Sequence, residues 1–99
     1  MTTVDHRKAA DDRLQSLIAE VQTQPPGPAR DAFLDECTSL SLAIRAFHME
    51  GIRFRMFNVD RLITRNALAI SDDARRAFAD VRTELEAAGF HTRSHQAPS

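Results

Sequence analysis

Heptad-spaced apolar residues run through about forty consecutive positions of this chain, from Pro28 to Ile70. A first stripe consists of Phe33, Cys37, Leu40, Ile44, Phe47, Gly51 and Phe54. A second stripe, with the same spacing on a different helix face, consists of Met49, Ile52, Met56, Val59, Ile63, Asn66 and Ile70. A helix that packs against other helices along its whole length needs apolar residues at this spacing. The run therefore predicts an all-α fold and indicates a packing partner.

Three helices account for the pattern, at about 4–24, 29–70 and 72–88. The segment QPPGP ends the first helix, because its prolines remove backbone donors and hold the chain extended. Ser71 is a good N-cap for the third helix, and Gly89 stands where a C-terminal glycine ends a helix. We expect residues 1–89 to form a single helical domain and the polar segment 90–99 to form a flexible tail.

The segment GIRFRMFNVD, residues 51–60, leaves alternatives open within the long second helix. A helix broken or kinked near Gly51 is one of them. Apolar residues also alternate with arginines over 52–56, which is a strand pattern. A strand there, followed by two helices, would be similar to the ribbon-helix-helix layout of small DNA-binding proteins. The second stripe runs straight through 52–70, and this favours a continuous helix.

A continuous helix over 29–70 would span roughly 60 Å and would have only one shorter helix beside it at most points. A second copy of the chain would bury the rest of its apolar surface. We therefore expect an antiparallel bundle that homodimerisation completes with a four-helix-type interface. The residues expected at this interface are Phe33, Cys37, Leu40, Ile44, Phe47, Ile52, Phe54, Met56, Val59 and Ile63.

Composition narrows the class of protein further. No hydrophobic run approaches the ~20 residues of a membrane span, and the first residues lack the apolar core of a signal peptide. Cys37 is the single cysteine and lies on the first stripe, so we interpret it as a small buried hydrophobe in a reducing compartment. Lys8 is the single lysine among many arginines, as in proteins from GC-rich bacterial genomes. These features predict a bacterial cytoplasmic protein.

Few residues suggest chemistry. The chain has no glycine-rich phosphate loop, no nucleophile elbow and no metalloprotease motif, so we expect neither an enzyme nor a cofactor. His91 and His95 are four residues apart and could bind a metal on one helix face, but they follow Gly89 in a segment without helical pattern. His48 suggests a phosphotransfer or haem-binding bundle as an alternative, although no lysine neighbours it to stabilise a phosphoryl group.

The positive charge gathers on one part of the chain, in Arg45, Arg53, Arg55, Arg61 and Arg65. These arginines can pair with acidic residues of the first helix or contact an acidic partner. They can also bind phosphates, because the guanidinium fork fits such groups. The net charge of −1 makes nucleic acid the weaker alternative. We expect a small non-enzymatic interaction or regulatory module, such as an adaptor, anti-regulator or chaperone-like protein, that binds itself and another protein.

Overall fold

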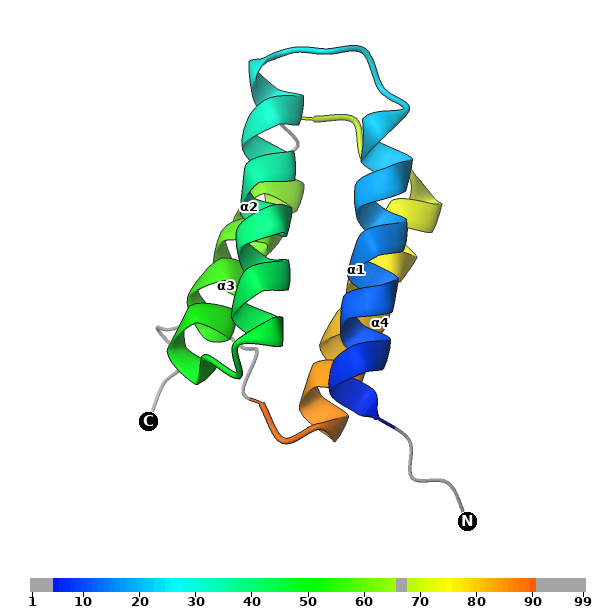
Figure 1. Cartoon of the computed structure of the whole chain (residues 1–99). Coiled ribbons are helices and arrows are strands. Elements are labelled where there is room, and N and C mark those ends of the chain that lie inside the picture. Colours follow the sequence, from blue (N-terminus) through cyan, green and yellow to red (C-terminus); the bar gives the residue numbers. More distant parts are fainter. Residues whose placement is uncertain (1–4, 66–67, 91–99) are drawn as a thin grey trace.

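The computed structural model describes residues 5–65 and 68–90, and all regular structure within them is helical (Figure 1). The helices are α1 (His6–Gln22), α2 (Pro28–Arg45), α3 (Met49–Thr64) and α4 (Asp72–Ala87). The prediction of an all-α fold is confirmed. The prediction of one helix over 29–70 is wrong, because two helices occupy this range. The strand alternative for 52–56 is also wrong, since these residues lie inside α3.

The turn between α2 and α3 breaks the expected long helix at residues 46–48. Phe47 has a positive φ of 57°, and its N–H donates to the carbonyl of Ile44. The N–H of His48 donates to the carbonyl of Ala43, which completes a Schellman motif at the end of α2. His48 then caps α3, because its Nδ1 accepts a hydrogen bond of 2.8 Å from the N–H of Gly51. The alternative of a break near Gly51 is therefore the correct one.

The two ends of α4 lie where Ser71 and Gly89 predicted them. The hydroxyl of Ser71 accepts from the N–H of Ala74 at 3.0 Å and caps the first turn. Gly89 follows the helix with a φ of 96°, and the N–H of Phe90 donates to the carbonyl of Leu85. This is a second Schellman motif. Phe90, the first residue assigned to the tail, is buried in the core.

The four helices form an up-and-down arrangement in which consecutive helices run in opposite directions (Figure 1). α1 packs closely against both α2 and α4, and α2 also packs closely against α3. In Figure 1, α1 and α2 lie side by side, with α3 behind α2 and α4 behind α1. The described part of a single chain therefore supplies a four-helix bundle, and most of the apolar surface that was expected to require a second copy is covered within one molecule.

Each helix contributes a buried stripe to one common core. α1 contributes Ala10, Leu14, Leu17 and Val21, α2 contributes Phe33, Cys37, Leu40 and Ile44, α3 contributes Ile52, Met56, Val59 and Ile63, and α4 contributes Ala74, Phe78, Val81 and Leu85. The first stripe up to Ile44 thus belongs to α2, the second stripe from Ile52 to Ile63 belongs to α3, and these parts face the same core. No helix among the described residues is long and apolar enough to cross a membrane.

Candidate interaction surface on α2 and α3

Most of the residues expected at a dimer interface lie inside the single chain. The buried ones are Phe33, Cys37, Leu40, Ile44, Ile52, Met56, Val59 and Ile63, each at most 7% exposed. Phe47 and Phe54 remain accessible, with 64% and 46% of their surface exposed. In this conformation, Phe47 and Phe54 are therefore the members of the expected interface that a partner can reach.

A shallow apolar groove lies between α2 and α3, near the turn that joins them. Leu42 and Phe54 stand on its two sides, and Leu42 is 60% exposed. Ala43, Ala46 and Gly51 are among the residues that line it. Small residues at these positions leave room for a side chain from outside. Two large exposed apolar side chains on one groove are a feature of binding surfaces, whereas single exposed ones are ordinary.

Gly51 is required where α3 begins beside α2. A Cβ atom at this position would meet Nδ1 of His48 and would come within 3.3 Å of the Cβ of Ala43. The glycine therefore allows His48 to cap α3 and allows the start of α3 to approach α2. Both effects shape the groove, because Ala43, His48 and Gly51 line it.

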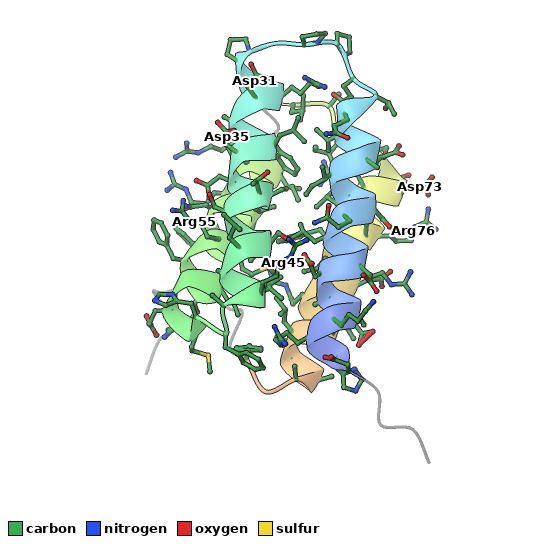
Figure 2. The ribbon with its side chains drawn as sticks, viewed as in Figure 1. Asp31, Asp35, Arg45, Arg55, Asp73 and Arg76 are labelled. Atoms are coloured by element: carbon green, nitrogen blue, oxygen red, sulfur yellow. The ribbon has the colours of Figure 1, made fainter. Side chains whose placement is uncertain are left out.

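The arginines expected to contact a partner are largely engaged within the chain. Arg45 donates from Nε to Asp11 of α1 at 3.0 Å, and it lies between α1 and α2 in Figure 2. Arg55 donates to both carboxylate oxygens of Glu36, at 3.1 and 3.2 Å. Arg53 pairs with Glu50 at 3.5 Å. All three arginines therefore pair within the chain, but only Arg45 pairs with the first helix as expected; Arg55 pairs with α2, and Arg53 pairs within α3.

The other two arginines lie farther along α3. Arg61 has its guanidinium carbon 5.5 Å from the ring centroid of Phe57 and is exposed. Arg65 is the C-cap of α3. Within residues 5–65 and 68–90, neither arginine lies in a salt bridge with a carboxylate. Both arginines are exposed.

Asp11 connects α1 to α2 through a polar cluster. Its carboxylate accepts a 2.7 Å hydrogen bond from Ser41 and further bonds from Arg45 and Gln15. Burial acts to raise the pKa of Asp11, but the hydrogen bonds from Ser41, Arg45 and Gln15 outweigh it and lower the pKa. Asp11 therefore stays charged and connects α1 to the side of α2 that carries Ser41 and Arg45.

The groups considered for chemistry give no assembled site in the described part of the chain. Cys37 is buried as expected, and burial, with the neighbouring charge of Glu36, raises the pKa of its thiol to about 12. His48 serves as an N-cap. His91 and His95 lie outside the described residues. Among those described, no cluster of three or more potential metal-ligating side chains is present.

Leu42 is the residue of this surface that sequence reasoning missed. It lies two positions from both Leu40 and Ile44, and so on the opposite side of α2 from the core stripe. A large apolar residue out of phase with its own helix was the available signal. No family model matches this chain, and neither a curated protein nor a solved structure does.

Proposed function

We propose that this protein is a non-catalytic interaction module that binds a polypeptide through the outer face of α2 and α3. The observation that carries the proposal is the exposure of Leu42 and Phe54 on one groove, when the core stripes of all four helices are buried. Exposing two large apolar side chains side by side costs solubility, and a partner that covers them removes that cost. The proposal places the protein in the cytoplasm, where a free thiol such as Cys37 is ordinary.

The shape of the groove favours a helical partner. α2 and α3 are antiparallel neighbours, and a third helix laid along their groove would meet Leu42 on one side and Phe54 on the other. An amphipathic helix presents anchors at i, i+3, i+4 and i+7, which suits a groove of this kind. The partners we propose are a second copy of this chain and another protein with such a helix.

Nucleic acid remains the weaker alternative. A phosphate-binding surface needs several unpaired cations on one face, whereas Arg45, Arg53 and Arg55 each contact a carboxylate of the same chain. The net charge of −1 adds no general attraction to phosphates.

Site-specific photo-cross-linking in the native cell tests the proposal. A photoreactive amino acid replaces Leu42 in one variant and Arg76 in a control variant. Arg76 is exposed on α4, on the opposite side of the molecule from Arg55 in Figure 2. We expect position 42 to give a discrete adduct that position 76 does not give, and we expect Phe54→Asp to abolish it. Equal labelling at both positions, or no adduct at position 42, would contradict the proposal.

A further inference from the structure

α3 carries a second stripe on the side opposite its buried one, which we call the outer stripe. It consists of Glu50, Phe54, Phe57 and Arg61, in steps of four, three and four. At 100° per residue these positions lie about 160° from the core stripe of the same helix. Glu50, Phe54 and Arg61 are exposed and Phe57 is partly exposed.

The outer stripe is self-complementary when it is reversed. Its order is acidic, aromatic, aromatic, basic, and the spacing is symmetrical about a point between Arg55 and Met56. In an antiparallel pair of α3 helices, Glu50 would therefore stand opposite Arg61 of the second copy. Phe54 would stand opposite Phe57 of the second copy. A two-fold axis makes each of these contacts occur twice.

Resting on the proposed function, we infer that the partner at this face is a second copy of the same chain. The two α3 helices pack antiparallel, with Phe54 on Phe57 in the centre and Glu50 paired with Arg61 at both ends. The four stripe positions span roughly 16 Å of helix, or about three turns. Leu42 lies across the groove from Phe54 and extends the interface onto α2.

The pairs within one chain do not oppose this assembly. Glu50 lies 3.5 Å from Arg53, and 67% of the Glu50 side chain but only 28% of the Arg53 side chain is exposed. A carboxylate accepts on two oxygens, so Glu50 can keep its contact with Arg53 while it meets a second cation. Glu50 can therefore accept Arg61 of the second copy at small cost. Arg61 already lies over the ring of Phe57, so that its charge stands at the edge of the aromatic centre.

The surface area that the dimer would bury sets the affinity that we expect for it. Stable interfaces bury about 800 Å² on each partner, and one helix stripe with Leu42 falls short of that. We therefore expect a dimer with a dissociation constant in the micromolar range, weakened by salt because its end contacts are charged.

Sedimentation equilibrium of the full chain over a concentration series tests the inference. We expect a monomer–dimer equilibrium that Phe54→Asp abolishes. Glu50→Arg alone and Arg61→Glu alone should each weaken association about tenfold or more, because each places like charges together twice. The double variant Glu50→Arg with Arg61→Glu restores opposite charges in every pair, and it should return to within a few fold of the original chain.

Asp73→Arg is the matched control. Asp73 pairs with Arg76 at 3.1 Å in the first turn of α4, as Glu50 pairs with Arg53 in the first turn of α3. The control variant therefore also loses an ion pair between residues i and i+3 of a helix, but on α4 and not on the outer stripe, and it should dimerise normally. Circular dichroism verifies the fold of each variant, and Glu50→Gln and Arg61→Gln replace any reversal that fails to fold.

Three results would overturn the inference. The first is a chain that is monomeric at about 1 mM, a concentration at which a micromolar dimer is nearly complete. The second is a dimer whose double charge reversal is as weak as the single ones. The third is a dimer that Phe54→Asp leaves intact. If the chain is monomeric but position 42 cross-links to another protein, self-association fails while the proposed function stands.

Discussion

The ring of Phe47 lies against the ring of Phe90, with centroids 6.1 Å apart and an interplanar angle of 43°. Each residue belongs to a Schellman motif, Phe47 after α2 and Phe90 after α4. The guanidinium carbon of Arg7 lies 3.8 Å from the centroid of Phe47, and its NH1 donates to the carbonyls of Ile44 and Arg45. One aromatic residue thus joins the end of α2 to α1 and to the segment after α4.

The backbone of Phe47 gives a first prediction. Its φ of 57° is unfavourable for any residue with a Cβ, by about 1–2 kcal/mol. Phe47→Ala keeps that strain and loses the contacts with Arg7 and Phe90, whereas Phe47→Gly loses the same contacts but relieves the strain. Urea unfolding should therefore find the glycine variant more stable than the alanine variant by about 1 kcal/mol. Equal stability of the two variants would contradict the positive φ.

Gly51→Ala gives a second prediction. Alanine normally stabilises a helix relative to glycine by about 1 kcal/mol. At this position the added Cβ meets the imidazole of His48, so we expect a net loss of stability in thermal unfolding. The same change in a His48→Ser background should cost less, since serine can cap the helix with a shorter side chain. An additive pair of effects would show that His48 is not the group that Gly51 accommodates.

Asp11 predicts a pH dependence. Its pKa is lowered in the folded state, so its contribution to stability is present above the unfolded value of 3.8 and is lost as the pH falls through the lower folded value. Asp11→Asn should be less stable than the original chain at neutral pH, and the difference should shrink below pH 3.8. The urea concentrations at the unfolding midpoint, measured for both chains from neutral pH to below pH 3.8, give this difference in stability.

Cys37 predicts slow thiol chemistry in the folded protein. Burial raises the pKa of its thiol to about 12, and the side chain has no exposed surface. A colorimetric disulfide reagent should therefore react only at the rate of unfolding, and quickly once urea is added. Rapid modification of the native chain would contradict the placement of Cys37 in the core.

Several parts of the fold follow directly from the sequence. The boundaries of α4 agree with expectation within a residue, because Ser71 and Gly89 are strong signals at either end. Most residues of the two expected stripes are also buried, namely Phe33, Cys37, Leu40 and Ile44 of the first and Ile52, Met56, Val59 and Ile63 of the second, whereas Phe47, Phe54 and Met49 are exposed.

The sequence did not predict that a turn would lie at residues 46–48. It contains neither glycine nor proline, and the residue with positive φ is Phe47, which seldom adopts that conformation. Contacts with Arg7 and Phe90, distant in sequence, accompany this conformation, so local propensity gave no sign of it. The two offset stripes were interpreted as two faces of one helix, when their buried parts are the inner faces of two antiparallel helices.

The candidate surface was predictable only in part. Phe54 was expected at an interface, and the structure leaves it exposed. Most of the other expected residues are buried, because folding α3 back onto α2 supplies within one chain the cover that a second copy was expected to provide. Leu42 can be recognised as part of this surface only when α2 and α3 are known to be neighbours.

The close packing of α1 against α4 has a consequence for synthesis on the ribosome. Of the four described helices, α1 is made first, and α4, against which it packs closely, is made last. Until residues of α4 such as Phe78 and Leu85 have emerged, the apolar side of α1 that they cover stays open to water and to chaperones. The bundle therefore completes its core only after translation of nearly the whole described chain, and nascent chains that stop before α4 should be degraded as unfolded.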